Sequence, residues 1–234
     1  MTPYERRTAY PAERKAALAF ALVLAVIVSV AVGCAGARRP STAVPRDLGE
    51  VEVREYKGER LGPLSAFRLN QIGKIPQVDR SSYRLKVDGL VKRPASYTYG
   101  DIVSKETSRT KVVTVFCVEG WSVKVLWEGV LLTDLIDRAG PGVEATTVIF
   151  HAADGYTTSL PLDYIRSRRI LLAYRQNGLE MAPSRGFPFQ VVAEDKYGYK
   201  WCKWVERIEL SSDSGYRGYW ESRGYDNDAD LGGP

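Results

Sequence analysis

Thiol and imidazole groups are scarce in this chain, which has three cysteines and one histidine among its 234 residues. Cys117 ends the β-branched run that begins at Val112, and the motif Glu119-Gly120-Trp121-Ser122 follows it. A cysteine in this position can be a small packed hydrophobe, half of a disulfide with Cys202, a nucleophile acting with His151, or a thiolate ligand of a metal. The residue types alone leave these four interpretations open.

The single histidine restricts the kind of metal site that the chain can build. A bis-histidine haem site, a zinc site with several histidine ligands and a two-histidine iron site are excluded for this chain alone. A bound metal must therefore be held mainly by carboxylates or thiolates, or arrive inside a preassembled cofactor.

A second candidate segment is His151-Ala152-Ala153-Asp154-Gly155-Tyr156, where a predicted strand ends in a turn. An Asp-Gly pair is typical of ordinary turns. The alternative is a binding loop, in which Tyr156 could donate a hydrogen bond to a substrate oxygen. We interpret His151 as a strand residue rather than as an acid–base group.

The composition is that of a folded protein, with 44% hydrophobic and 26% charged residues. The net charge of +5 comes partly from basic residues near the N-terminus, including Arg6, Arg7, Arg14 and Lys15. The chain has no block of Lys and Arg suited to following a nucleic-acid backbone. We therefore expect no nucleic-acid partner.

The N-terminal segment, residues 1–34, predicts export or membrane attachment. Residues 16–34 are apolar up to Cys34, at the short end of the roughly 20 residues that span a bilayer and somewhat long for a signal peptide. Ala31-Val32-Gly33-Cys34 resembles a bacterial lipobox, whose cysteine is lipidated after cleavage. Arg6-Arg7 matches the twin-arginine export consensus poorly. We expect an extracytoplasmic chain, periplasmic or on the outer face of the cell membrane, and leave open a signal peptide, a membrane anchor and a lipoprotein.

The rest of the chain predicts a single α+β domain with a mixed sheet. Residues 35–66 have little periodicity and are expected to be a linker, residues 67–212 the domain, and residues 213–234 a tail whose first half packs and whose end frays. Strands are expected at 83–87, 111–117, 148–151, 189–193 and 200–210, and short helices at 133–139 and 162–168.

Several of these elements carry a more specific prediction. Residues 111–117 are β-branched on both faces, which is typical of a buried central strand. Thr133 is the predicted N-cap of its helix, and Gly140 ends that helix. Asn177-Gly178 predicts a β-hairpin. Alternation along 200–210 places Cys202 in the core, on the face opposite Lys203.

Four ordered blocks of the chain resemble one enzyme family, the sulfite-oxidase-type molybdopterin-binding oxidoreductases. FCVEGWSVKVLWEGVLLTDLI resembles the family's metal-binding signature, in which a strand-end cysteine precedes a Gly/Ala-Trp-Ser motif. The other three blocks, which cover the family's entry strand, its aspartate-glycine-tyrosine loop and its C-terminal cofactor-binding region, are LKVDGLVKRP, HAADGYTTSLPL and NGLEMAPSRGFPFQVVAEDKYGYKWCKWVERIEL. Together they cover about residues 67–212.

The resemblance implies that the chain binds molybdenum-molybdopterin (Mo-MPT) and that Cys117 supplies a thiolate to the metal. A soft thiolate suits a redox metal, and the cofactor carries the difficult chemistry. Asn70 falls where the family has a pterin-contacting asparagine, and Trp121 is expected to wall the pocket. The resemblance also implies that the segment Trp201, Cys202 and Lys203 binds the cofactor phosphate. It places the backbone of Ala152 at the pterin, and Asp154 and Tyr156 at the substrate.

The chain also departs from the family pattern in three places. Arg185 stands where the family often has His or Asn before Gly-x-Pro, and Gln190 stands where it has an arginine. We expect both to contact the cofactor. Animal and plant sulfite oxidases also have arginines near the metal-binding cysteine, whereas Thr114 to Phe116 carry no charge here. The motif Cys-Val-Glu-x-Trp-Ser resembles the periplasmic protein-methionine-sulfoxide reductase branch of the family more than the sulfite oxidases.

We therefore expect a molybdopterin-dependent oxidoreductase that transfers an oxygen atom in a sulfoxide-reductase-like or sulfite-oxidase-like reaction, on a small-molecule or protein-sulfoxide substrate. It would exchange electrons with a separate partner, such as a haem-bearing membrane protein, because one histidine leaves no room for an internal b-type haem. The alternatives are a non-catalytic exported lipoprotein module with a Cys117–Cys202 disulfide, and an enzyme with Cys117 as nucleophile.

Overall fold

The computed structural model describes residues 51–232. The predicted signal, lipobox and anchor features of residues 1–34, and the first half of the linker, lie outside these residues. Among the residues that are described, no helix is both long and apolar enough to cross a membrane.

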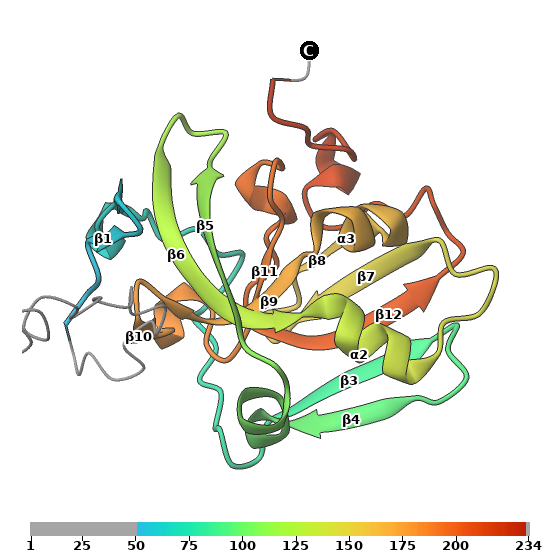
Figure 1. The fold of residues 1–234 in the computed structure, drawn as a ribbon. Coiled ribbons are helices and arrows are strands. Elements are labelled where there is room, and N and C mark those ends of the chain that lie inside the picture. The colour runs from blue at the N-terminus through green and yellow to red at the C-terminus, as the bar shows by residue number, and fades with distance from the viewer. Residues whose placement is uncertain (1–50, 233–234) are drawn as a thin grey trace, which may run out of the picture. The chain divides into compact units, whose positions relative to one another are not determined.

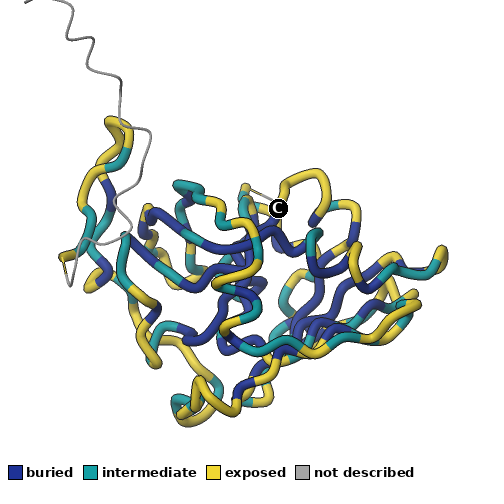
Figure 2. Tube along the Cα trace, turned by 60° about the horizontal axis from the view of Figure 1, so that its bottom comes forward, coloured by how far each residue is buried: buried dark blue, intermediate teal, exposed yellow. Residues whose placement is uncertain are grey.

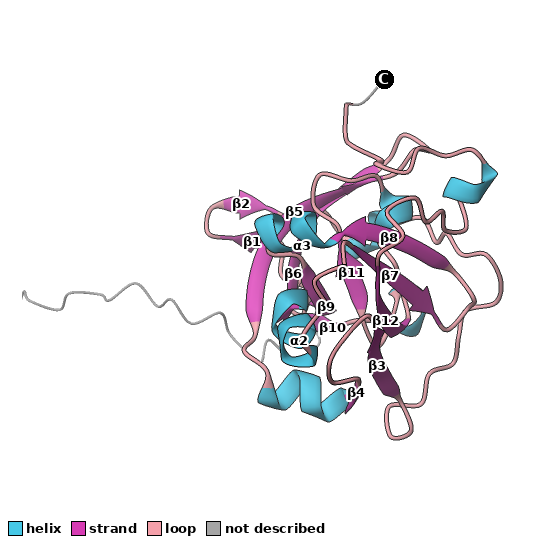
Figure 3. Ribbon diagram, turned by 90° about the vertical axis from the view of Figure 1, so that its right-hand side faces the viewer, coloured by secondary structure: helices cyan, strands magenta, loops and turns pink. Residues whose placement is uncertain are grey.

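Two five-stranded sheets make up the fold (Figures 1 and 3). The sheet that we call the site sheet has the order β10-β9-β6-β5, with β11 pairing β9, and consists of β5 (Arg109–Phe116), β6 (Ser122–Leu131), β9 (Leu171–Gln176), β10 (Leu179–Glu180) and β11 (Gln190–Val192). The second sheet has the order β4-β3-β12-β7-β8 and consists of β3 (Arg84–Gly89), β4 (Ala95–Thr98), β7 (Thr147–Ala152), β8 (Thr157–Pro161) and β12 (Val205–Ser211). All pairs are antiparallel except β3 with β12.

Two short helices lie at the junction of the sheets. Helix α2 (Leu132–Ala139) packs against β6 of the site sheet and β3 of the second sheet, and α3 (Leu162–Arg168) packs against β8 and α2 (Figure 1). Single helical turns occur elsewhere, at Leu64–Ala66, Asp101–Lys105, Pro183–Arg185, Gly198–Lys200 and Glu221–Arg223.

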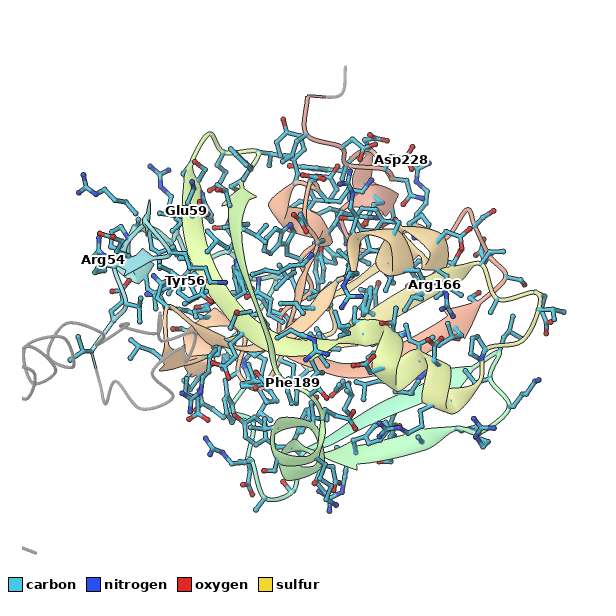
Figure 4. All side chains as sticks on the ribbon, viewed as in Figure 1. Arg54, Tyr56, Glu59, Arg166, Phe189 and Asp228 are labelled. Atoms are coloured by element: carbon cyan, nitrogen blue, oxygen red, sulfur yellow. The ribbon has the colours of Figure 1, made fainter. Side chains whose placement is uncertain are left out.

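The core lies where the sheets meet, and the buried segments gather inside the domain while the exposed segments lie mostly at its periphery (Figure 2). Phe189, which precedes β11, packs its ring 5.7 Å from Tyr83 and 5.4 Å from Tyr99 (Figure 4). The backbone also joins the sheets here, because Val191 N donates to Cys202 O at 2.9 Å and Val205 N to Phe189 O at 3.1 Å. The segment that runs from β11 to β12 is therefore held on both sides.

The α+β class, the mixed sheet and most elements agree with the predictions, including the Asn177-Gly178 hairpin between β9 and β10. The predicted central position of residues 111–117 is wrong, because β5 is an edge strand whose one neighbouring strand in the described residues is β6, apart from an isolated bridge between Phe116 and Tyr197. Only Val113 and Val115 are buried in it. Branched side chains fit a pleated surface at a sheet edge as well as at its centre, so they do not report the number of neighbouring strands.

Two predicted details of local structure are also wrong. Thr133 is not an N-cap, because β6 runs directly into α2 and Leu131 takes the cap position without a side-chain hydrogen bond. The backbone N–H of Leu132 donates instead to Ile170 O at 3.0 Å. The strand expected over 200–210 begins only at Val205, because Trp204 has a φ of 52° that breaks the alternation. Cys202 is nevertheless fully buried.

Both ends of the described chain pack onto the domain. Within the range expected to be linker, β1 (Glu55–Tyr56) and β2 (Glu59–Arg60) form a hairpin beside β6, where Lys124 pairs with Glu59 at 3.1 Å (Figure 4). At the other end, Tyr197 N donates to the carbonyl of the buried Ala229 at 2.9 Å, and Leu231 N donates to Asp195 O at 3.0 Å. The prediction that the tail frays is therefore wrong as far as Leu231.

Candidate active site

A cavity of about 580 Å³ opens between the end of the site sheet and the loops around it. This volume lies within the range of pockets that bind small molecules and cofactors. Gln176 of β9 lines its wall, together with residues from five other parts of the chain. These parts are residues 67–73, the β5–β6 turn with Cys117 to Trp121, the loop after β7 with Asp154 and Tyr156, the segments from Ser184 to Trp204, and the tail residues Trp220 and Tyr225.

Cys117 is placed by a tight hairpin turn between β5 and β6. Its N–H donates to Trp121 O at 2.9 Å, and Gly120 N donates to Cys117 O at 3.0 Å. Gly120 has a φ of 84°, the left-handed conformation that a three-residue hairpin loop of this kind requires. Because side chains alternate along a strand, Cys117 shares a face with the buried Val113 and Val115 and joins Val115 in the cavity wall.

The surroundings of the Cys117 sulfur favour the neutral thiol. Burial raises its pKa, and the Glu119 carboxylate acts in the same direction, against the backbone N–H groups of Glu119 and Val118 and the charge of Arg68. The Asn70 side chain donates to the sulfur, with 3.7 Å between Nδ2 and Sγ. The cysteine is free rather than disulfide-bonded, as is Cys202.

Two further cations line the cavity. The Arg185 guanidinium donates to Leu64 O and lies 5.5 Å from the centre of the Phe67 ring, and its burial lowers its pKa. Lys203 Nζ donates to the backbone oxygen of Asn70 and lies 4.3 Å from the Trp204 ring. Burial lowers the pKa of Lys203 to about 8. Together with Arg68, they give the cavity three basic side chains against the carboxylates of Glu119 and Asp154.

Asp154 and Tyr156 face the cavity from the loop between β7 and β8. Asp154 Oδ1 accepts a hydrogen bond from Tyr156 N at 3.0 Å, which shapes the turn. The Tyr156 hydroxyl donates to Tyr199 O, and burial raises its pKa. The hydroxyl that we expected to donate to a substrate oxygen is therefore engaged by the protein.

Eight of the ten predicted site residues line this one cavity: Asn70, Cys117, Asp154, Tyr156, Arg185, Gln190, Trp201 and Lys203. The other two do not. Ala152 is buried at the end of β7, and its N–H donates to Tyr156 O at 2.9 Å. The Cys202 thiol is enclosed in the core, where burial raises its pKa well above the ordinary value.

The nucleophile interpretation of Cys117 has no geometric support. His151 is not in the cavity wall, and its Nε2 lies 2.8 Å from Glu209 on the neighbouring strand β12. A reactive cysteine also needs a lowered pKa, whereas that of Cys117 is raised. Within residues 51–232, no group of three His, Cys, Asp or Glu side chains could hold a metal ion.

Sequence reasoning missed several residues of the wall. Arg68 and Phe67 lie within three residues of the predicted Asn70. Their closeness to Asn70 in the sequence was the only sign that they could line the same cavity. The aromatic residues of the tail predicted that it packs onto the domain, but not that Trp220 and Tyr225 line the cavity. That place depends on distant contacts such as the ion pair in which Lys200 Nζ lies 2.7 Å from Glu221 Oε1, with side chains that are 1% and 0% exposed.

The family model described as the oxidoreductase molybdopterin binding domain matches residues 72–220. The uncharacterized oxidoreductase YuiH of Bacillus subtilis (strain 168) is 35% identical over 163 residues, which are 69% of this chain and 81% of YuiH. The putative protein-methionine-sulfoxide reductase subunit YedZ1 of Azospira oryzae is 31% identical over 151 residues, 64% of this chain and 57% of that protein.

Two more distant similarities concern longer proteins. NADH nitrate reductase 1 of Arabidopsis thaliana is 30% identical over 189 residues, which are 66% of this chain and only 21% of the reductase. The crystal structure of the sulfane dehydrogenase SoxCD from Paracoccus pantotrophus superposes with a TM-score of 0.57 at 23% identity, over 59% of this chain and 40% of that one. The SoxCD similarity establishes the shared fold.

Proposed function

Because the chain belongs to the oxidoreductase molybdopterin binding domain family, we propose that it transfers oxygen atoms at a molybdenum centre held by Cys117. The protein is an oxidoreductase of the sulfite-oxidase type, and its cofactor is molybdenum-molybdopterin. The observation that carries the proposal is the free Cys117 thiol in the wall of a cavity of about 580 Å³. When bound, the cofactor supplies a metal that exchanges electrons while oxygen moves to or from a substrate.

The residues of the cavity fit this cofactor. A cysteine thiolate is the soft ligand that a redox metal in a sulfur environment prefers. Lys203 and Arg185 offer cations to the phosphate of the pterin, and Asn70 and Gln190 offer further polar contacts. Trp201 offers only the surface of its ring, because its indole N–H donates to Lys196 O at 3.0 Å. Because no cluster of His, Cys, Asp and Glu could hold a metal ion within residues 51–232, the metal must arrive in a preassembled cofactor.

In the cofactor-free site the surroundings favour the neutral thiol of Cys117, so its proton must be displaced when the metal binds. Metal binding takes the thiolate, so the thiol proton has to leave on ligation. Arg68 and the N–H groups of Val118 and Glu119 oppose the effect of burial on the thiol pKa, and Asn70 donates to the sulfur. These groups prepare the sulfur for the metal.

Asp154 is the residue that we assign to proton exchange during oxygen transfer. Its carboxylate lines the cavity, and the N–H of Tyr156 fixes one of its oxygens at 3.0 Å. Tyr156 is assigned to closing the wall beside the substrate, because its hydroxyl is engaged by Tyr199 O. The substrate that suits this wall is a sulfoxide or a sulfur oxyanion, whose oxygens accept hydrogen bonds from the basic side chains.

We further propose that a separate redox partner, a haem-bearing membrane protein, exchanges electrons with the site. The single histidine supports a separate partner, because the chain cannot build a bis-histidine haem of its own. The apolar run at residues 16–34 supports export or anchoring, with residues 1–34 as the targeting segment and the oxidoreductase domain on the extracytoplasmic side.

The proposal is tested by metal and pterin analysis of the purified protein and of Cys117→Ser. We expect about one molybdenum per chain in the wild type and its loss in the variant, with the fold intact by circular dichroism. Cys202→Ser is the matched control and should keep its molybdenum, because Cys202 lies outside the cavity wall. Molybdenum retained by Cys117→Ser would refute the role of Cys117.

A further inference from the structure

A buried amide in the cavity wall has a polar atom without a partner. Gln176, the last residue of β9, is 1% exposed and lines the cavity together with Gln190, the first residue of β11. Its Nε2 donates to Gln190 Oε1 over a long 3.4 Å. Its Oε1 is buried, and no group within residues 51–232 donates a hydrogen bond to it.

The next residue shows what a purely structural amide looks like here. Asn177 is also fully buried, but its Oδ1 accepts from Leu126 N at 2.9 Å. Its Nδ2 donates to Glu52 Oε1 at 2.9 Å and to Gly62 O at 3.0 Å. The protein therefore satisfies Asn177 and leaves the Gln176 oxygen to whatever fills the cavity. Buried polar atoms are rarely left unpaired, because they lose their hydrogen bonds to water and gain nothing in return.

We infer that Gln176 Oε1 accepts a hydrogen bond from an N–H group of the pterin ring and thereby holds the cofactor in the cavity. The inference rests on the cavity being the cofactor site. The pyrimidine part of a pterin presents adjacent ring N–H and amino groups, both of which are donors. A carbonyl oxygen is the matching acceptor.

The chemistry of the unpaired atom excludes the other occupants. A phosphate group, a sulfur oxyanion and a sulfoxide oxygen all accept hydrogen bonds, and a carbonyl oxygen would repel them. These groups are matched instead by the donors Arg68, Arg185 and Lys203. Gln176 and Gln190 are 1% and 5% exposed, so the part of the ligand that reaches them must be enclosed. A retained cofactor meets this condition better than a substrate that exchanges in every turnover.

The test compares Gln176→Met, which keeps the shape and removes the polar atoms, with the wild type. The holoenzyme is passed through a desalting column at intervals, and the pterin that remains is oxidised and measured by its fluorescence. We expect the variant to lose pterin about tenfold faster, the effect of one hydrogen bond of ordinary strength. Gln176→Glu, which keeps an acceptor oxygen, should lose pterin at a rate between those of the wild type and Gln176→Met.

A second readout separates this role from a structural one. The cofactor-free Gln176→Met protein should melt at about the same temperature as the wild type, because the substitution removes an unpaired buried carbonyl oxygen and only one long hydrogen bond to Gln190. Gln77→Met makes the same chemical change at an exposed position and should alter neither measurement. Wild-type retention in Gln176→Met, or a lower melting temperature that accounts for its loss, would overturn the inference. A wild type without pterin would instead refute the cofactor assignment.

Discussion

Replacing Glu221 with glutamine should loosen the C-terminal segment from the cavity wall. Lys200 and Glu221 form an ion pair of 2.7 Å in which neither side chain is more than 1% exposed. Thr158 Oγ1 donates to the same carboxylate oxygen at 2.5 Å. Glutamine keeps the size and the contact with Thr158, so the change removes the negative charge and leaves a buried ammonium without its partner.

The expected cost is about 3–5 kcal/mol at pH 7, the range for breaking one partner of a buried pair. This cost has an upper limit, because Lys200 can lose its proton and become neutral instead of staying charged without a partner. With an ordinary lysine pKa of about 10.4, deprotonation at pH 7 costs about 5 kcal/mol. Burial already lowers the pKa of Lys200, and the charge of Glu221 is the largest effect that opposes this lowering.

The same reasoning fixes how the loss depends on pH. In the variant the folded-state pKa of Lys200 lies far below that of the unfolded chain. The unfolded chain therefore binds more protons, and the stability of the variant rises with pH up to about 10.4. The deprotonation cost falls to about 2 kcal/mol at pH 9. The destabilisation by Glu221→Gln should shrink accordingly.

The assay is urea unfolding of the cofactor-free protein at pH 7 and pH 9, followed by tryptophan fluorescence. The double variant Lys200→Met, Glu221→Gln removes both charges and should regain most of the lost stability. A loss below about 1 kcal/mol at pH 7, or a loss that is the same at both pH values, would refute the description of this pair as buried and coupled.

Three further predictions concern the cavity wall. Gly218→Ala should lower the melting temperature by several degrees in a thermal scan, because a Cβ there would lie 2.2 Å from Thr157 O and displace the tail. Retention of pterin should fall as pH rises through about 8. Burial lowers the pKa of Lys203 to about 8, so above this pH the phosphate of the cofactor loses a cationic partner. Lys203→Met should abolish this pH dependence. Arg185→Ala should lower the molybdopterin content of the purified protein, measured by pterin fluorescence, and an unchanged content would reject its role.

The sequence predicted the position of Cys117 because that position depends on local structure. A branched run predicts a strand with one buried face, and a glycine three residues after the cysteine allows the left-handed turn that closes the hairpin. The order of the four family-like blocks then places the other predicted residues around the same cavity. Eight of ten line it, although they come from segments that lie far apart in the chain.

The features that escaped prediction depend on tertiary structure. An edge strand and a central strand have the same residue pattern, so β5 was assigned to the wrong place in the sheet. The tail has a composition typical of loops, and tertiary contacts such as the buried Lys200–Glu221 pair and the bond from Tyr219 N to Thr157 O bring it to the cavity. Gln176 stands next to the hairpin residue Asn177, and nothing in the sequence separates a satisfied amide from an unsatisfied one.

The charge near the sulfur shows why the substrate cannot be inferred from the cysteine strand alone. Thr114 to Phe116 carry no charge, whereas animal and plant sulfite oxidases have arginines near the metal-binding cysteine. The structure places the charge of Arg68, from a segment nearly fifty residues earlier, close enough to Cys117 to oppose part of the rise in its thiol pKa that burial causes. An incoming anion responds to the summed electrostatic potential of the cavity, whichever segments supply the charges. The substrate should therefore be sought among anionic and neutral sulfur oxides alike, and Arg68→Gln should weaken the binding of the anionic ones selectively.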